Sequence, residues 1–413
     1  MTVKAVAVVS HVIDVINKEG GRKMKLNSLH LAGCVLVSLA LTVGAQTATD
    51  SSPATQSADA GCFQLSLVTP VQIQNADRAI NGLRINLIYG LNTDVSGMDI
   101  GIINHASGVL NGFEIGVVNI VEGSSSAVQL GLVNGVGEDM SGVQTAPVGV
   151  NYVGGGNTGW QLVGAGACVA MTEMDGGQLN MFGINYVGGD GDNQITAAGI
   201  NWISEVQNGG QLVGAGLNNA GSDADLQIAG FGVNLGQANV SAGQLVGAGF
   251  NIVLESVDKQ IVAAGLNYAG DIASGIQLSG AGVNWAGGLC DAQLVALGLN
   301  AGLEDVIGGQ YNIAGANFAN NDVDGGQWTA GAGINIAGGA VTGAQVIPTL
   351  LGINYANELD GAQWSMINVA TTVKGFQFGA INYCDELEGL QIGIINIAVQ
   401  NTLPVMVIVN ANW

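Results

Sequence analysis

Residues 211–218 read QLVGAGLN, and this stretch returns with small changes through most of the chain. A Gln opens each unit, an Asn closes it, and a short turn of small and acidic residues leads to the next. Self-similarity at a fixed period is the signature of a repeat architecture, so the way this one unit folds decides the fold of the chain.

The opening Gln and the closing Asn form two long series. The Gln series comprises Gln129, Gln144, Gln161, Gln178, Gln194, Gln211, Gln227, Gln244, Gln260, Gln277, Gln293, Gln310, Gln327, Gln345, Gln363, Gln377 and Gln391. Arg84, Asp99 and Glu114 hold the Gln place in the earlier units, and Cys168 interrupts the Asn series once.

The unit is expected to be a β-strand, because two glycines within eight residues would each cost a helix about 1 kcal/mol relative to Ala. Strict alternation places Gln211, Val213, Ala215 and Leu217 on one face and Leu212, Gly214, Gly216 and Asn218 on the other. Terminal units such as QIGIIN are two residues shorter, a change that keeps Asn on the face opposite Gln.

A longer period of 33 residues comes from spacings that alternate between 16 and 17 from Asn185 to Asn317. Asp lies two residues before every second Gln, as at Asp192 and Asp225. In the other units a Gly lies at that position or next to the Gln. Alternating turns are expected where strands run up and down, with turns at two ends. A flattened solenoid with two strands per coil would give the same pattern.

The composition argues against a nucleic-acid partner. The chain has 413 residues, 67 of them Gly, and only 10% are charged, so both faces of most strands lack charge. Beyond residue 45, four cationic residues stand against 29 acidic ones. A net charge of −25 argues against a nucleic-acid partner, because such binding depends on cationic contacts to phosphate.

The N-terminal region predicts export. Residues 31–43 are an apolar run of 13 that follows basic residues from Lys25 and precedes a small-residue cleavage site before Gln46. The run is too short for a membrane-spanning helix and is typical of a secretory signal. The expected organisation is a mis-assigned extension at 1–23, a signal peptide at 24–45, a flexible linker at 46–61 and one repeat domain at 62–413.

The favoured fold is all-β, a repeat-built antiparallel β-barrel of about 22 strands in an outer membrane. A ten-residue strand rises about 33 Å, and a barrel tilt reduces that span to roughly 25 Å. The aromatic residues after Asn, such as Tyr186 and Trp202, would share the Gln face and form interfacial girdles. The alternative is a β-solenoid with two strands per 33-residue coil, stacking Asn218, Asn251 and Asn284 as an internal ladder.

Several segments resemble a known family. GLRINLIYGLN (82–92), MDIGIIN (98–104), FEIGVVN (113–119), LQIGIIN (390–396) and LPVMVIVN (403–410) are similar to the surface-repeat proteins of two-membraned bacteria, whose repeats read GLQIGLIN or GVQLAGLVN. The resemblance implies an exported, surface-associated protein and supplies no catalytic residue. The closing strand, which ends in Trp413, also resembles the C-terminal signal of outer-membrane barrels.

Catalytic, cofactor and metal-site signatures are not found. His105 is the one His beyond residue 45, and a single His supports no Ser–His–Asp set. Cys62, Cys168, Cys290 and Cys384 are far apart and form no CxxC, and their disulfide state stays open. Acidic residues cluster at the turns, where weak divalent-cation binding is the one cofactor-like role predicted. These clusters are Asp190/Asp192, Asp223/Asp225, Asp322/Asp324 and Asp385/Glu386/Glu388.

The expected function is therefore that of a non-enzymatic outer-membrane or surface-exposed barrel with a structural or passive-transport role. Its partners would be outer-membrane lipid and the barrel-assembly machinery. The alternative is a surface-exposed β-solenoid that acts as an interaction or adhesion scaffold. The barrel hypothesis places Ala215 against lipid, so both Ala215→Arg and Gly216→Val are expected to be harmful.

Overall fold

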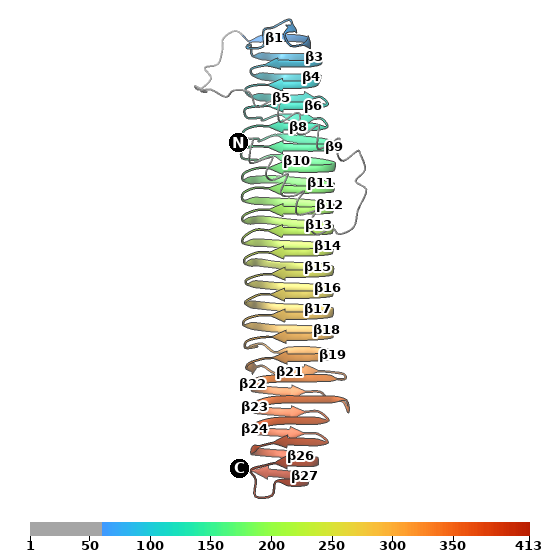
Figure 1. Ribbon diagram of the computed structural model, residues 1–413, viewed down its shortest axis with the longest axis vertical. Helices are drawn as coiled ribbons and strands as arrows, with labels where there is room; N and C mark the ends of the chain where they lie inside the picture. The colour runs from blue at the N-terminus through green and yellow to red at the C-terminus, as the bar shows by residue number, and fades with distance from the viewer. Residues whose placement is uncertain (1–59) are drawn as a thin grey trace, which may run out of the picture. The chain divides into compact units, whose positions relative to one another are not determined.

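The computed structural model describes residues 60–413, and the unit Gly61–Trp413 is a single stack of β-coils. Most coils contribute one long bent strand that pairs in parallel with the strands of the coils before and after it, and a few coils contribute two shorter strands (Figure 1). About 21 coils of roughly 16 residues follow one another, so at 4.8 Å per strand the stack is about 100 Å long.

The strands follow the chain in order. The first group comprises β1 (Gly61–Val68), β2 (Val71–Gln72), β3 (Ile80–Asn92), β4 (Val95–Ala106), β5 (Leu110–Ile115), β6 (Val118–Val121), β7 (Val128–Leu130), β8 (Val133–Val136), β9 (Val143–Val153) and β10 (Trp160–Ala170). The central group comprises β11 (Met174–Val187), β12 (Gly191–Ile203), β13 (Gln207–Ala220), β14 (Ala224–Gly236), β15 (Val240–Val253), β16 (Val257–Ala269), β17 (Ala273–Ala286) and β18 (Cys290–Gly302). The last group comprises β19 (Gln310–Ala319), β20 (Val323–Asp324), β21 (Gln327–Thr329), β22 (Gly333–Val346), β23 (Gly352–Trp364), β24 (Ile367–Phe378), β25 (Ile381–Cys384), β26 (Glu386–Ala398) and β27 (Val405–Asn412).

A glycine corner bends each central strand. In β13 the corner residue is Gly216, which has a φ of +147°. A Cβ on Gly216 would lie 1.8 Å from the carbonyl oxygen of Gly199 in the preceding coil, so no other residue fits the stack at this point. The corner also resets the alternation of side chains, because the two exposed residues Gly214 and Ala215 follow one another directly.

The interior of the coil is lined by both amide series. Gln211 and Asn218 are both buried, although they are seven positions apart, because the corner lies between them. Gln227 donates from Nε2 to Oε1 of Gln211 at 2.9 Å, and Asn218 donates from Nδ2 to Oδ1 of Asn234 at 2.9 Å. The Gln column therefore donates toward the N-terminal coils and the Asn column toward the C-terminal coils, so their side-chain dipoles oppose each other.

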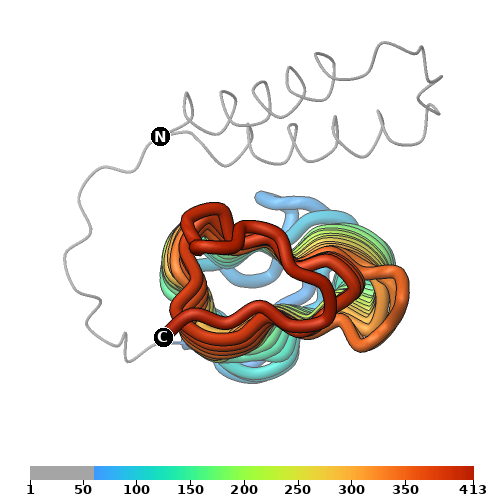
Figure 2. Tube along the Cα trace, turned by 90° about the horizontal axis from the view of Figure 1, so that it is seen from below, coloured from blue at the N-terminus to red at the C-terminus, as the bar shows by residue number. Residues whose placement is uncertain are grey.

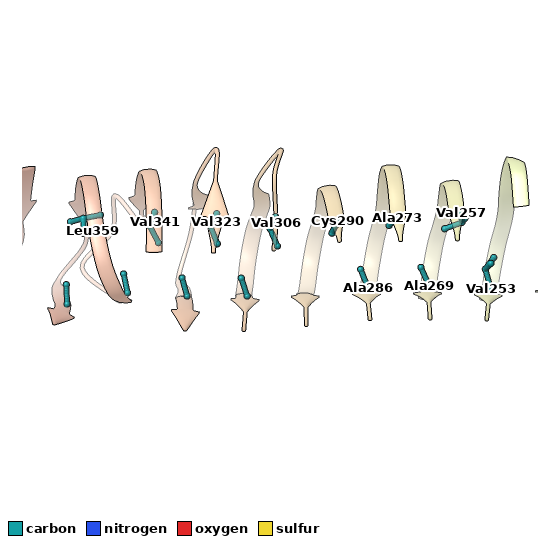
Figure 3. Packing of buried hydrophobic residues seen from close by; sticks show 14 of the residues in the cluster. Val253, Val257, Ala269, Ala273, Ala286, Cys290, Val306, Val323, Val341 and Leu359 are labelled. Carbon is teal, nitrogen blue, oxygen red and sulfur yellow. The ribbon is translucent and has the colours of Figure 1, made fainter. Parts of the chain in front are cut away.

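Apolar rows flank the two amide columns. Viewed end-on, the central coils nearly superimpose, and the N-terminal coils are displaced from their outline (Figure 2). Near the loops, two rows of small side chains face each other across the interior. Val253 and Val257 form one facing pair of these rows, and Ala269 and Ala273 form another (Figure 3). Near the corner, a third row contains Val213, Ala229, Val246 and Val262. Val and Ala predominate in these rows, and larger residues such as Leu359 and Met174 take the same places in some coils.

The antiparallel barrel prediction is wrong. The long strands pair in parallel, and the first and last strands are not neighbours, since β1 pairs with β2 and β3 while β27 pairs with β26. The aromatic residues also lie on a different face from the one expected. Tyr186 and Trp202 point outward and oppose each other in register, whereas Gln178 and Gln194 point inward. They therefore form no membrane girdles.

The two-strand coil of the alternative prediction is also wrong in its period. Asn218 contacts Asn234, the closing residue of the very next unit, so each 16- or 17-residue unit is a complete coil. The alternation comes from a one-residue bulge, because Gln207–Gly210 in β13 opposes Ala224–Leu226 in β14. All loops of the central coils consequently lie on one edge, and the two turn types do not mark two ends.

Candidate interaction surface

The outer surface of a coil divides into two edges with different chemistry. Leu212, Gly214, Ala215 and Leu217 surround the glycine corner and carry no polar side chain. This surface and its equivalents in other coils are called the corner edge. The opposite edge contains the loop at residues 221–223 and the neighbouring Asp225, and it is called the loop edge. The stack is thus amphipathic along its length.

The corner edge continues from coil to coil because the strands are in register. Leu212 opposes Ile195 on one side and Ile228 on the other, and Ala215 opposes Ala198 and Phe231. Its most exposed large side chains are distributed along the whole stack. They include Ile102, Leu132, Val148, Met181, Phe182, Phe231, Phe250, Leu297, Ile313 and Ile394, with exposed fractions from 47% to 70%.

A shallow groove runs along part of this edge. It has a volume of about 390 Å³ and is lined by residues of four successive coils, including Leu179, Met181, Ile195, Leu212 and Ile228. Gly214 and Gly230 line it where other units carry Met181 or Ala197, so the missing side chains create the depression. The groove is apolar and contains no titratable side chain, which suits contact with an apolar partner and offers no acid–base chemistry.

Some acidic residues of the loop edge accept hydrogen bonds from the backbone of the next loop. The Oδ1 atom of Asp190 accepts from the Val206 amide at 3.1 Å, and that of Asp322 accepts from the Ala340 amide at 2.7 Å. Within residues 60–413, no three His, Cys, Asp or Glu side chains converge as a metal ion requires. Asp190 and Asp322 therefore link successive loops, and weak cation binding at the Asp and Glu clusters stays a prediction.

A buried charged column occupies the N-terminal coils. Arg84, Asp99 and Glu114 lie in the same column as the Gln residues, and all three are fully buried. The Arg84 guanidinium forms an ion pair with Asp99 and donates to the His105 carbonyl at 2.8 Å. Burial, together with the neighbouring Asp99 carboxylate, raises the pKa of Glu114 well above its usual value. Gln129 donates to Glu114 at 2.7 Å and joins this column to the amide ladder.

His105 lies on the outer surface beside the charged column. Its Nδ1 atom is 2.9 Å from the Tyr89 hydroxyl and its Nε2 atom is 3.0 Å from Glu122. Burial lowers the pKa of His105, and Glu122 partly opposes that effect. No Ser, Cys or Thr is among the hydrogen-bond partners of this imidazole, so the geometry provides no nucleophile for it to activate.

The four cysteines of the described region are separate and reduced. Cys62 is exposed, whereas Cys168, Cys290 and Cys384 are buried. Burial raises the pKa of the Cys168 thiol, and burial with a nearby Asp raises that of Cys290 and of Cys384 to about 12. Buried thiols that stay protonated are poor nucleophiles, so these three cysteines act as small core residues.

The structure contains no helix within the described residues that is long and apolar enough to span a membrane. Comparisons with protein-family models, curated proteins and solved structures gave no match. The corner edge, a continuous apolar surface that alternation did not predict, is therefore the feature on which a function can be argued. The sequence indicates the corner edge through the apolar residues that lie next to each GxG. Alternation alone places these residues on two different faces of the strand.

Proposed function

We propose that the protein is a non-catalytic interaction scaffold of the cell surface, with the corner edge as its contact surface. The observation that carries this proposal is the continuity of exposed apolar side chains along successive coils, such as Leu212, Phe231 and Leu245. Soluble proteins rarely expose a contiguous apolar patch above a few hundred Å², and larger patches usually mark contact sites.

The loop edge supports the same function. Its carboxylates carry most of the negative charge, which keeps the stack soluble while the opposite edge stays available for contact. Parallel coils present the same small apolar motif about every 4.8 Å, so many weak contacts act together on one extended partner. A repetitive, multivalent surface of this kind suits adhesion better than recognition of a single small molecule.

The cellular location is part of the proposal and depends on the N-terminal sequence. The secretory signal at 24–45 and the linker at 46–61 fall largely outside the described residues, which begin at 60. The similarity to surface-repeat proteins of two-membraned bacteria points to the same address. A transport role is not proposed, because the parallel coils enclose a packed interior of Gln, Asn, Val and Ala.

Adhesion of intact cells tests the proposal. Cells that export the chain are compared with cells that export a corner-edge variant carrying Leu212→Ser, Phe231→Ser and Leu245→Ser. We expect the variant to lose most of the adhesion to a polystyrene surface. Protease added to intact cells should also degrade the wild-type protein, because the proposal requires an exposed location.

A matched variant changes three apolar residues of the loop edge. Leu254, Leu289 and Leu303 are similarly exposed, so Leu254→Ser, Leu289→Ser and Leu303→Ser remove a comparable amount of apolar surface. Exposed substitutions of this kind usually change the free energy of unfolding by less than about 0.5 kcal/mol. Equal adhesion by both variants, or protection of the wild-type protein from added protease, would overturn the proposal.

A further inference from the structure

The charged column of the N-terminal coils holds two carboxyl groups and one cation. Arg84 on β3, Asp99 on β4 and Glu114 on β5 follow one another in register, and each residue is 0% exposed. The next residue of the column is Gln129 of β7, a neutral amide. If both carboxyl groups were ionised, this part of the interior would carry one negative charge that no cation balances.

The single cation neutralises Asp99. The Arg84 guanidinium forms an ion pair with the Asp99 carboxylate, whose Oδ1 atom also accepts from Nδ2 of Asn86 at 3.0 Å. Glu114 has one neutral donor, since Nε2 of Gln129 donates to its Oε2 atom at 2.7 Å. The Oε1 atom of Glu114 is buried without a hydrogen-bond partner. A buried carboxylate with an unpartnered oxygen is costly, so these contacts favour a protonated Glu114.

The charged groups that face Glu114 are few. Asp99 of β4 opposes its ionisation by repulsion, and Arg84 of β3 favours it from two coils away. The Asn column, the other polar row of this interior, contributes amides only, such as Asn104 and Asn119. Burial and the Asp99 carboxylate raise the pKa of Glu114 well above its usual value, in agreement with the unpartnered oxygen.

The regular strand pairing is interrupted beside this column. β5 contains six residues, β6 four, β7 three and β8 four, whereas a central strand such as β13 contains 14. A coil of a solenoid contacts only its neighbours, so terminal coils can open while the rest of the stack stays folded. The short strands therefore give residues 61–121 a boundary at which they can separate from the central coils.

We propose that the charged column is a pH-operated switch, which opens the N-terminal coils at residues 61–121 when Glu114 loses its proton. While the proton is present, Arg84 and Asp99 balance each other and the column has no net charge. Loss of the proton leaves one uncompensated negative charge in a fully buried position. Opening the coils hydrates that charge, whereas the Gln column from Gln129 onward contains amides only and stays closed.

The direction of the switch follows from the signs of two pKa shifts. The folded-state pKa of Glu114 is raised, so its contribution to the stability of these coils is full below the unfolded-state pKa and is lost as the pH rises through the folded-state pKa. Between these two pKa values, each pH unit makes opening about tenfold more favourable. His105 acts in the opposite sense, because burial lowers its pKa and the coils lose stability as the pH falls. The N-terminal coils are therefore most stable at an intermediate pH.

The switch does not depend on the proposed function, but it bears on the corner edge. Ile100 and Ile102 are exposed residues of that edge, and both lie in the segment that opens. Opening removes them from the register of the stack, so the continuous apolar surface becomes shorter at high pH.

Hydrogen exchange of the backbone amides tests the switch in the full chain. Relative to Glu114→Gln, the protection factors of β3–β5 in the wild-type protein should fall at least tenfold between pH 5 and pH 8. This ratio removes the contribution of His105, which both proteins share. Gln is the regular residue of the column, as at Gln129, so Glu114→Gln should fold. The corresponding ratio for β13–β17 should stay close to one, because the opening does not reach them.

Trypsin gives a second readout, because the bond after the buried Arg84 becomes accessible only when the coils open. At pH 8, cleavage there should be at least tenfold faster in the wild-type protein than in Glu114→Gln. Glu138→Gln is the matched control, since it makes the same change at an exposed carboxylate of the next coil and should behave as wild type. A protection ratio for β3–β5 that changes less than tenfold, or an equal change in β13–β17, would overturn the proposal. Loss of the pH dependence in Glu138→Gln would do the same.

Discussion

Replacing Cys168 by Asn should stabilise the protein. Cys168 lies between Asn151 and Asn185 in the Asn column, where a thiol replaces an amide. Each regular Asn donates to the Asn of the next coil, but Cys168 supplies no such donor, and Oδ1 of Asn185 is buried without a partner. The Cys168 sulfur instead lies 3.5 Å from the Gln161 carbonyl oxygen.

The magnitude follows from the groups that gain partners. An unsatisfied buried acceptor costs about 1–3 kcal/mol, and a regained hydrogen bond adds about 0.5–1.5 kcal/mol net. The larger side chain offsets part of this gain, although the column already holds Asn in the coils on both sides. We therefore expect Cys168→Asn to raise the free energy of unfolding by roughly 1–3 kcal/mol.

The reciprocal substitution provides the control. Asn251 donates to Oδ1 of Asn267 at 2.9 Å, so Asn251→Cys creates the interruption that Cys168 makes naturally. Denaturant midpoints and hydrogen exchange of the amides in β9–β11 and β15–β16 measure both variants. Asn251→Cys should destabilise by a similar amount, and the double variant should be close to wild type. A Cys168→Asn variant that is less stable than wild type would refute the ladder argument.

Two further outcomes follow from the corner and from the charged column. Gly216→Val should abolish folding or lower stability by several kcal/mol, because the positive φ of Gly216 and its contact with the Gly199 carbonyl oxygen exclude a side chain. Ala215→Arg should change stability by less than about 0.5 kcal/mol. Thermal unfolding followed by circular dichroism compares the two variants. The raised pKa of Glu114 means that its contribution to stability is full below the unfolded-state pKa and is lost as the pH rises through the folded-state pKa. Glu114→Gln should therefore be more stable than wild type at pH 7 and lose that advantage at pH 4, as denaturant titrations at the two pH values would show.

The sequence was sufficient to predict the strands, the repeat and the exceptional residues of each series. Arg84, Asp99 and Glu114 were assigned to the Gln place, and the structure puts them in the Gln column. The Asn ladder of the solenoid alternative also exists, with twice the predicted number of members. Each of these inferences depended on counting residues between equivalent positions, which a regular stack preserves.

Alternation alone could not predict which face of the strand each side chain occupies, because a single backbone angle changes the assignment. A strand without a corner puts Gln211 and Asn218 on opposite faces, and this led to a two-faced sheet that needed lipid on one side. At a φ of +147°, Gly216 turns the chain and brings both amides inside. Ala215, assigned to lipid, is an exposed residue of the corner edge, so of the two substitutions only Gly216→Val is now expected to harm.

The odd spacing of the two amides is the clue that could have separated the solenoid from the barrel. One uncharged amide pair per unit, with a GxG between its members, is hard to satisfy in a barrel, because one member would face lipid without a partner. In a parallel stack, each amide faces its own copy one coil away and can donate to it, as Gln227 does to Gln211 at 2.9 Å. Hydrogen-bonding needs of the buried amides, more than hydrophobic alternation, therefore determine this architecture.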